Sequence, residues 1–378
     1  MDILKIGFDA KRLFNNFTGL GNYSRTMIQN LNNYYPENQY YLFTPKTQHK
    51  PDTKHFLNKP YNIIKPTWEP KSIWRSFACT KQINKLKLQI YHGLSHELPI
   101  GIKKTGAKSL VTIHDLIYKT YPNDFKAIDR KIYDYKFRYA CENADTIIAI
   151  SKSTKTDLVS IYNIPPEKIE VVYQSCHQNF KKPLNSTQIN TILKQYNLPN
   201  KYMLYVGSII ERKNLLGIVK AMQKIKDQIK IPLVVVGNGK EYQQKVQNYI
   251  TENNLEKQVI FTSHISYFDL PAIYQNASLF LYPSNYEGFG IPIIEALWSK
   301  TPVITSNISS LPEAAGKGAF YCNPNDENTI AEGIIKIIND ADYSMQLTNM
   351  GYEHVKQFEN DINAKKLMQV YKAVINNG

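Results

Sequence analysis

The stretch that decides the fold runs from residue 286 to residue 298 and reads YEGFGIPIIEALW. An apolar run at 279–283 precedes it and predicts a buried strand. Gly288 and Gly290 then predict a turn, and Pro292 opens an apolar helix. The free N–H groups at such a helix start favour anionic or hydroxyl-rich ligands, so this block predicts a binding site as well as a strand–turn–helix unit.

Two carboxylates bracket this turn. Glu287 lies before the helix and Glu295 lies within it, eight positions further on. At about 1.5 Å of rise per helical residue, we expect the two carboxylates to be roughly 8–10 Å apart. That separation suits the two ends of one extended ligand better than one shared proton. The structural alternative is an ordinary helix start with an acidic first turn.

Four further segments place polar groups or glycines at strand ends. GSIIERKNL (207–215) sets Arg212 and Lys213 behind a strand, where a guanidinium and an ammonium form a diphosphate clamp. VTIHDL (111–116) puts His114 at a strand end. VVVGNG (234–239) and TGLGNY (18–23) carry glycine turns that let the backbone approach a ligand. Taken singly, each has an ordinary structural explanation: a solvated basic pair, a core histidine or a tight turn.

Strands and helices alternate along both halves of the chain. Short β-branched runs at 5–9, 40–44, 90–92, 109–114 and 146–151 are separated by helical stretches at 23–33, 72–87 and 127–143. The same pattern resumes with strands at 201–207, 233–237, 258–262, 277–283 and 302–306. This alternation predicts an α/β protein with two doubly wound parallel sheets. We expect domains at 1–178 and 179–357, and a closing helical segment at 358–378.

Charge distinguishes the two halves. The 378 residues carry a formal charge of +14. Residues 1–178 hold 26 basic and 15 acidic residues, an excess of +11, whereas residues 179–378 hold 20 and 17, an excess of +3. A basic first half favours a polyanionic partner, and the alternative is a general bias towards lysine. Four scattered cysteines favour a reducing cytoplasm over a disulfide framework.

In this order, the segments resemble the retaining glycosyltransferases of family 4, which have the GT-B fold. The resemblance covers nearly the whole chain, including ISKSTKTDL (150–158), and TPVITSNISSLPEAAG (301–316) behind the Glu-x7-Glu block. It implies two Rossmann-like domains facing a central cleft. The second domain would hold a nucleotide-sugar donor and the first an acceptor, and the segment 358–378 would return to the first domain.

The resemblance also implies a role for individual residues. His114, Glu287, Arg212 and Lys213 would be catalytic: Glu287 would bond the donor sugar, the two cations would neutralise the leaving diphosphate, and His114 would position the reacting face. Glu295 would accept hydrogen bonds from the ribose, and the 262–265 loop would hold the base. The implied donor-binding set is Gly19, Gly21, Gly207, Arg212, Lys213, Gly237, Ser263, His264, Glu287, Gly288, Phe289, Gly290, Ile291 and Glu295.

No metal or other cofactor is expected. The Asp-x-Asp pair, Asp340 and Asp342, falls in a helix-and-turn region far from any strand end, so we interpret it as surface. No residue stands out as a covalent nucleophile. The resemblance therefore implies front-face attack, with an oxygen of the leaving phosphate as the base.

Several functions compete with this interpretation. A GT-B sugar-nucleotide epimerase would share the nucleotide and the cleft. A Rossmann dehydrogenase would require GxGxxG after the first strand, which TGLGNY does not provide. A nucleic-acid-binding protein would require a recognisable basic and aromatic module, and none is legible. Within the transferases, GDP-mannose and UDP-sugars both remain possible donors, and we favour GDP-mannose.

The expected partners follow from the same resemblance and from the charge. They are a nucleotide-sugar donor, a glycan or lipid-linked diphosphate acceptor of cell-surface polysaccharide synthesis, and no nucleic acid. We expect a cytoplasmic enzyme that contacts the anionic inner face of the membrane through its basic half. The candidate basic contacts are Lys103, Lys104, Lys108, Lys71, Arg75, Lys126, Arg130 and Lys131, and the residues expected to insert on an amphipathic helix are Trp68, Ile73, Trp74 and Phe77. The alternative is that these aromatic residues belong to the ordinary core.

Overall fold

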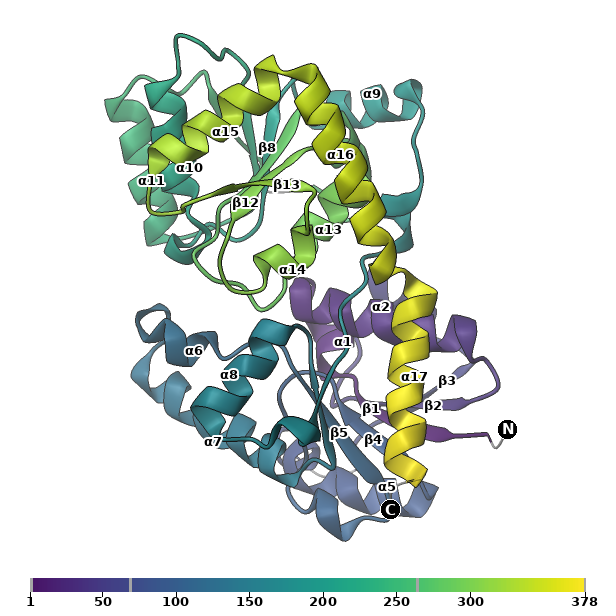
Figure 1. The fold of residues 1–378 in the computed structure, drawn as a ribbon. Coiled ribbons are helices and arrows are strands. Elements are labelled where there is room, and N and C mark those ends of the chain that lie inside the picture. The colour runs from purple at the N-terminus through teal and green to yellow at the C-terminus, as the bar shows by residue number, and fades with distance from the viewer. Residues whose placement is uncertain (1–2, 68–69, 263–264, 377–378) are drawn as a thin grey trace. The chain divides into compact units, whose positions relative to one another are not determined.

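The chain folds into two α/β units, each built on one parallel sheet (Figure 1). The computed structural model describes residues 3–67, 70–262 and 265–376. Unit 1 comprises Met1–Ser175 together with Phe358–Gly378, and unit 2 comprises Cys176–Gln357. Each unit has its own apolar core of Val, Ile, Leu and aromatic side chains. The prediction of two doubly wound parallel sheets is confirmed.

The sheet of unit 1 has seven parallel strands in the order β3-β2-β1-β4-β5-β6-β7. Strand order reverses between β1 and β4, because the chain first builds outward on one side of β1 and then on the other. Ligands of doubly wound sheets bind at the carboxyl edge of such a switch point. The strands are β1 (Lys5–Asp9), β2 (Gln39–Phe43), β3 (Tyr61–Ile64), β4 (Ile90–Gly93), β5 (Lys108–Ile113), β6 (Thr146–Ala149) and β7 (Ile169–Val171).

Helices cover both faces of this sheet, as the alternation of elements requires. Helix α8 begins where the side chain of Ser151 accepts a hydrogen bond from the amide of Thr154 at 2.9 Å, an N-cap. The helical segments are α1 (Lys11–Asn15), α2 (Gly19–Tyr34), α3 (Pro51–Lys54), η1 (His55–Leu57), α4 (Lys71–Ile73), η2 (Trp74–Ala78), α5 (Cys79–Leu86), η3 (Ile102–Lys104), α6 (Ile117–Thr120), η4 (Pro122–Asp124), α7 (Ala127–Asn143), α8 (Lys152–Tyr162), η5 (Pro166–Lys168) and α17 (Asn360–Asn376).

The last helix, α17, belongs to unit 1 although it is the end of the chain. It packs against α2 and buries Leu367, Met368 and Tyr371 (Figure 1). The hydroxyl of Tyr371 lies 2.7 Å from Nδ1 of His92, and Nε2 of His92 lies 2.8 Å from Oγ1 of Thr112. This buried polar chain ties the helix to the centre of the sheet.

The predicted helix over 72–87 is interrupted. Residues Trp74–Ala78 form a π-helical turn, so side chains before and after it point in directions that a regular helical period does not give. Trp74 is 1% exposed and stacks on Phe43, and Arg75 forms ion pairs with Asp9 and Glu97. The expectation that Trp74 and Arg75 contact a membrane is therefore wrong; Trp68 lies outside the described residues.

The sheet of unit 2 has six parallel strands in the order β10-β9-β8-β11-β12-β13, with its switch point between β8 and β11. All five strands predicted for this half are confirmed, and β13 was not expected. The strands are β8 (Met203–Val206), β9 (Leu233–Val236), β10 (Val259–Thr262), β11 (Leu279–Tyr282), β12 (Val303–Ser306) and β13 (Ala319–Cys322).

The helices of unit 2 follow their strands in turn. Asp340, of the Asp-x-Asp pair, accepts a hydrogen bond from the amide of Tyr343 at 2.9 Å and pairs with Lys336 at 2.6 Å, so its carboxylate caps a helix. The segments are η6 (Gln178–Lys181), α9 (Ser186–Gln195), η7 (Glu211–Lys213), α10 (Leu215–Lys224), α11 (Glu241–Glu252), α12 (Leu270–Asn276), α13 (Ile291–Trp298), α14 (Leu311–Ala315), α15 (Glu327–Asn339), α16 (Ala341–Val355) and η8 (Lys356–Phe358).

Among the described residues, no helix is long and apolar enough to cross a lipid bilayer.

Candidate active site

The switch point of unit 2 brings together residues that are about 75 positions apart in the sequence. Arg212 and Lys213 follow β8, and Glu287 follows β11, the neighbouring strand. Because the strands are parallel, both loops leave the sheet at its carboxyl edge. The amide of Asn285 donates to the carbonyl of Arg212 at 2.8 Å, which joins the two loops directly.

Two glycine turns make room for the cations. The amide of Gly207 donates to the carbonyl of Val236 at 2.9 Å, so the turns after β8 and β9 are in contact. A Cβ on Gly237, whose φ is +151°, would lie 1.9 Å from the carbonyl oxygen of Gly207. A Cβ on Gly207 would lie 3.3 Å from the side chain of Lys213. Gly237 is therefore required by packing, and Gly207 leaves the space through which Lys213 passes.

The cations converge on one oxygen of Glu287. Its Oε1 is 3.0 Å from Nη1 of Arg212 and 2.9 Å from Nζ of Lys213. The hydroxyl of Tyr282 donates to the same oxygen at 3.0 Å, and Lys213 also donates to that hydroxyl. Arg212 Nη1 additionally donates to the carbonyl of Tyr286. Within the described part of the chain, Oε2 of Glu287 makes no hydrogen bond.

Serines behind the site hold the Glu287 turn in place. The backbone amide of Glu287 donates to Oγ of Ser309 at 3.1 Å. The hydroxyl of Ser310 lies 2.8 Å from the Glu287 carbonyl and 3.0 Å from the Phe289 carbonyl, both of which are acceptors. Gly290 then precedes α13 in the left-handed conformation, at φ +117°. These bonds fix the backbone on both sides of Gly288, so the carboxylate is presented from a rigid turn.

The electrostatics of the cluster favour an additional anion. The side chains of Arg212, Lys213 and Glu287 are 10%, 12% and 12% exposed. Burial alone would raise the pKa of Glu287, but Lys213 and Arg212 outweigh it and lower the pKa to about 2. Burial, and then the charge of Arg212, lower the pKa of Lys213 although Glu287 opposes this. Two cations share one carboxylate, so within these three residues the cations outnumber the carboxylate by one.

Glu295 has a different environment. It lies on α13, is 4% exposed, and accepts hydrogen bonds from Tyr267 at 3.3 Å and from Tyr274 at 3.2 Å. No cation forms an ion pair with it among the residues that the structure describes. Burial raises the pKa of Glu295 to about 8, more than the tyrosine hydrogen bonds lower it. Near neutral pH this carboxyl group therefore carries a proton, and it can both donate and accept.

Of the remaining predicted residues, Ile291 is the first residue of α13, and the others lie in unit 1 or outside the described residues. His114 follows β5, and its Nε2 lies 2.9 Å from the carbonyl of Leu94. A carbonyl only accepts, and burial lowers the pKa of His114 to about 4, so the neutral ring is protonated on Nε2 and Nδ1 is an acceptor. A Cβ on Gly21 would lie 1.8 Å from the carbonyl of Asn16, whereas Gly19 has open space. Ser263 and His264 lie outside the described residues.

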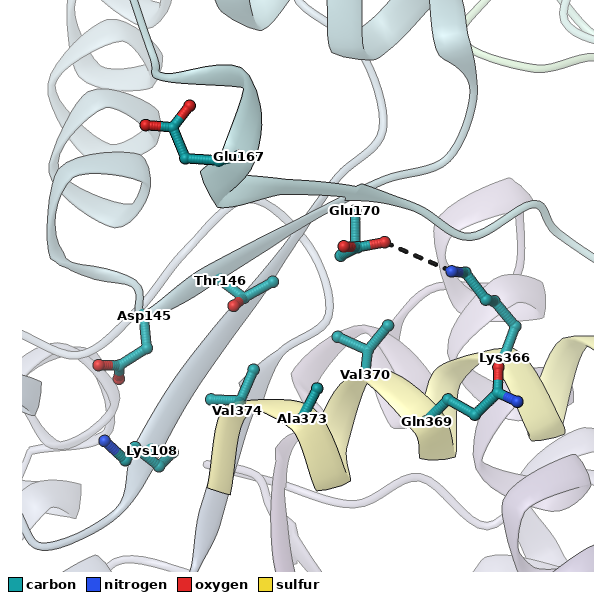
Figure 2. A pocket seen from close by; sticks show the side chains of 10 residues that line it. All are labelled: Lys108, Asp145, Thr146, Glu167, Glu170, Lys366, Gln369, Val370, Ala373 and Val374. Carbon is teal, nitrogen blue, oxygen red and sulfur yellow. Dashed lines mark hydrogen bonds and ion pairs between the residues drawn. The ribbon is translucent and has the colours of Figure 1, made fainter. Parts of the chain in front are cut away.

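A pocket of about 440 Å³ lies at the opposite edge of the sheet of unit 1 (Figure 2). Lys108 begins β5 and Thr146 begins β6, so both mark the amino edge of the sheet. Glu170 pairs with Lys366 of α17 at 3.4 Å, and Asp145 and Glu167 lie on the same wall. The pocket has both acidic and basic lining residues, and it lies at the end of the sheet opposite to its carboxyl edge. It is therefore not the site that the sequence motifs predict.

The tyrosines and serines of the site were not predicted from the sequence. Tyr282 is the last residue of β11, and Tyr267 and Tyr274 lie just before and within α12. Ser309 and Ser310 lie in the quoted segment 301–316. Their side chains carry no spacing pattern of their own. Only Tyr282 could have been recognised from the sequence, because it places a polar hydroxyl group at the end of an otherwise apolar strand.

Comparisons with known proteins agree with this architecture. Two family models match: Glycosyltransferase Family 4 over residues 17–175, and Glycosyl transferases group 1 over residues 188–354. The O-antigen chain mannosyltransferase B of Escherichia coli is 26% identical, over 97% of this chain and 100% of that protein. The O-antigen chain mannosyltransferase RfbU of Salmonella typhimurium is 28% identical, over 71% of this chain and 70% of its own length.

Solved structures share the fold at lower identity. A glycosyltransferase from Rickettsia africae aligns over 100% of both chains with a TM-score of 0.79 and 18% identity. The sucrose-phosphate synthase of Thermosynechococcus elongatus aligns over 99% of this chain and 100% of its own with a TM-score of 0.79 and 21% identity. Two Rossmann-like parallel-sheet units of this kind define the GT-B class of proteins. Within that class, the chain is similar to the glycosyltransferases of family 4, because its first half matches the Family 4 model and its second half the group 1 model.

Replacement of Glu295 by glutamine is expected to remove a pH-dependent loss of stability. With a folded-state pKa of about 8 and an ordinary value of 4.5, the unfolded chain releases this proton at a lower pH than the folded chain. The wild-type protein therefore loses stability as pH rises through this window. At about 1.4 kcal/mol per pKa unit, Glu295→Gln should gain several kcal/mol relative to wild type between about pH 5 and pH 8.

Urea unfolding of the full chain at both pH values, followed by circular dichroism, measures this difference. Glu256→Gln is the matched control, because Glu256 is exposed and belongs to the same unit. The control should shift stability equally at both pH values. If Glu295→Gln behaves like the control, the carboxyl group is ionised in the folded protein.

Proposed function

We propose that this chain transfers mannose from GDP-mannose to a hydroxyl group of a glycan or a lipid-linked acceptor, with retention of configuration, during cell-surface polysaccharide synthesis. The family supports transfer of a sugar from a nucleotide donor. The choice of mannose rests on the two relatives named as O-antigen chain mannosyltransferases, one of which aligns over its whole length. A UDP-sugar is the alternative donor.

The observation that carries this proposal is the convergence of Arg212 and Lys213 on a single oxygen of Glu287. The cluster has one excess positive charge and lies at the carboxyl edge of the switch point. A nucleoside diphosphate gains negative charge as it leaves, and fixed cations stabilise that charge most strongly in a buried site. Oε2 of Glu287 is in turn the acceptor for donor-sugar hydroxyls, because Oε1 already accepts from Lys213 and Tyr282 and pairs with Arg212.

The proposed chemistry is a front-face displacement. The bond between the anomeric carbon and the phosphate oxygen breaks, the acceptor oxygen bonds to that carbon, and the acceptor proton passes to the leaving phosphate. No metal is invoked, because Arg212 and Lys213 supply the compensating charge. His114 is neutral and has an acceptor nitrogen, so its proposed role is to orient a substrate hydroxyl rather than to attack.

The direct test combines the purified chain with a panel of nucleotide sugars and first records thermal shifts. A ligand that binds only the folded state stabilises it by mass action. We expect the largest shift with GDP-mannose, and transfer that continues in EDTA. NMR of the product should show the anomeric configuration of the donor. An inverted product, or activity that requires added divalent metal, would contradict those parts of the proposal. An epimerised nucleotide sugar without a new glycosidic bond would identify an epimerase instead.

Glu287→Gln should separate sugar transfer from nucleotide binding. The change is nearly isosteric but removes the charge that accepts from the donor sugar. A charge-assisted hydrogen bond contributes about 1.5–3 kcal/mol, so kcat/KM should fall roughly 10- to 150-fold. Binding of the nucleoside diphosphate without sugar should be unchanged or tighter, because Arg212 and Lys213 lose their carboxylate partner. Steady-state kinetics and calorimetry measure the two effects, and unchanged kcat/KM would remove the assigned role.

We also propose that unit 1 binds an anionic membrane surface where a lipid-linked acceptor resides. The support is an apolar stripe on α7: Ile128, Ile132 and Tyr135 are 67%, 45% and 64% exposed and recur at helical spacing. Lys131 lies exposed among them, and Lys126 is exposed just before the helix. Basic residues near an anionic leaflet contribute about 1 kcal/mol each.

Co-sedimentation with vesicles tests this surface. Ile128→Ser combined with Ile132→Ser should reduce binding to anionic vesicles at low salt by at least about 100-fold, because each of the two apolar side chains withdrawn from water is worth about 1.5–3 kcal/mol. Met345→Ser, at a site that is 60% exposed in unit 2, is the control and should bind like wild type. If the wild-type protein binds neutral and anionic vesicles equally, and salt does not change this, the basic residues do not contribute to membrane binding. If it binds neither kind of vesicle, the membrane proposal is wrong and the acceptor is soluble.

A further inference from the structure

The switch point of unit 1 carries charged residues to which neither the motifs nor the comparisons assign a role. It lies between β1 and β4, at the carboxyl edge of the sheet. Lys11 and Arg12 follow β1, and His96 and Glu97 follow β4. In a doubly wound sheet this is the place where a ligand binds.

Four charged side chains form an ion-pair network with no net charge at this edge of the sheet. Arg75 donates to both carboxylate oxygens of Asp9 through Nε, at 3.1 and 3.0 Å, and to Glu97 at 2.6 Å. Lys136 pairs with Glu97 at 3.1 Å. The side chains of Asp9 and Arg75 are 4% and 11% exposed, so the network is largely buried. Its two positive and two negative charges balance.

Lys11 and Arg12 lie beside this network without a partner of their own. The short helix α1 buries Leu13 and Phe14, and it leaves Lys11 and Arg12 half-buried at its start. Neither side chain forms a hydrogen bond or an ion pair with any residue in the described part of the chain. Burial, and then the charge of Arg75, lower the pKa of Lys11. Glu97 and Asp9 oppose this effect on Lys11, and the two positive charges lie together without a directly paired carboxylate among the described residues.

His96 provides an independent sign of a binding site in the same corner. Its backbone adopts the left-handed conformation, with φ of +63°, which is costly for a residue with a side chain. The residue is 7% exposed, and its Nδ1 has no hydrogen-bond partner among the described residues. Its ring stacks on Phe137 at 4.1 Å and lies 5.1 Å from the ring of His114. A strained residue with an unsatisfied buried nitrogen is typical of a functional site.

Arg12 lies close enough to act on both imidazoles. Burial contributes most to the low pKa values of His96 and His114, and the positive charge of Arg12 lowers both further. The charge of the guanidinium group therefore acts on the corner that the two histidines line.

We propose that Lys11 and Arg12 bind a diphosphate, with His96 as an additional hydrogen-bonding group, and that this diphosphate belongs to the acceptor. The assignment to an acceptor rests on the proposed transferase function. A diphosphate that joins a sugar to a lipid has about one negative charge on each phosphate, which matches the two uncompensated cations. The alternative source of the same chemistry is the diphosphate of the donor, for which unit 2 already has Arg212 and Lys213.

Kinetics with two acceptors distinguish the two sources. The acceptors carry the same glycan, one on a lipid diphosphate and one on a neutral alkyl group. Lys11→Gln and Arg12→Gln should each raise KM for the diphosphate acceptor about 10- to 150-fold, the range for a charge-assisted hydrogen bond. KM for the donor and activity on the neutral acceptor should not change. A raised donor KM would assign the cations to the donor, and equal losses on both acceptors would indicate a structural role; either result overturns the proposal.

Lys5→Gln is the matched control. Lys5 is also half-buried and without an ion pair to any described residue, and it lies at the amino end of the same strand, β1. The Lys5→Gln variant loses the same charge from unit 1 but is unchanged at the carboxyl edge of the sheet, so its kinetic constants should equal those of wild type. His96→Asn retains a residue that tolerates the left-handed conformation, and it should raise KM for the diphosphate acceptor only.

A binding measurement that needs no turnover keeps this proposal separate from the transferase function. Inorganic pyrophosphate is titrated into the full chain by calorimetry, with GDP or UDP present in excess to occupy the site of unit 2. The double variant Lys11→Gln, Arg12→Gln should bind pyrophosphate at least tenfold more weakly than wild type or Lys5→Gln, with an unchanged circular dichroism spectrum. Equal binding by all three proteins would overturn the proposal, whatever the outcome of the transfer assays.

Discussion

The buried contact between Glu287 and the two cations Arg212 and Lys213 is the interaction on which the rest of unit 2 depends. Removing one partner from a buried ion cluster costs about 3–5 kcal/mol, so its geometry must be held closely. The glycine turns after β8 and β9 make room for Lys213, and Ser309 and Ser310 hold the carboxylate turn from behind. The cluster remains one positive charge in excess. A site that is costly for folding in this way is well suited to an anionic ligand that completes it.

Unit 1 uses the same physical arrangement with different residues. Its ion network is electrically balanced, and the excess positive charge resides in Lys11 and Arg12 beside it. A second buried polar chain runs from Tyr371 through His92 and Thr112 to the hydroxyl of Tyr23. The ring of Tyr23 meets His114 edge-on at 4.6 Å, so the last helix of the chain supports the residue predicted to orient the substrate. In both units, two neighbouring basic side chains lie at the carboxyl edge of the sheet beside the switch point.

Local sequence patterns were sufficient to predict the central strands of both sheets, but they did not predict three of the edge strands. Central strands such as β8, β9 and β11 are buried on both faces and therefore read as continuous apolar runs. The missed strands β3, β7 and β13 are edge strands of three or four residues, with too little burial to produce such a run. The orientation of Trp74 and Arg75 was wrong because a π-helical turn changes the helical period, and no spacing in the sequence announces that turn.

The sequence alone determined the class of the molecule and the chemical character of its site. Alternating apolar runs required two parallel sheets, and the Glu-x7-Glu block with Arg212 and Lys213 required an anion- and hydroxyl-binding site at a strand end. Only the tertiary structure decided which groups share a proton or a charge. It set Lys213, Arg212 and Tyr282 on one oxygen of Glu287 and gave Glu295 two tyrosines and no cation, and it left Lys11 and Arg12 unpaired. The reason is that burial and charge compensation depend on neighbours that the fold brings together from distant positions, whereas spacing along a strand or helix reports only on residues a few positions apart.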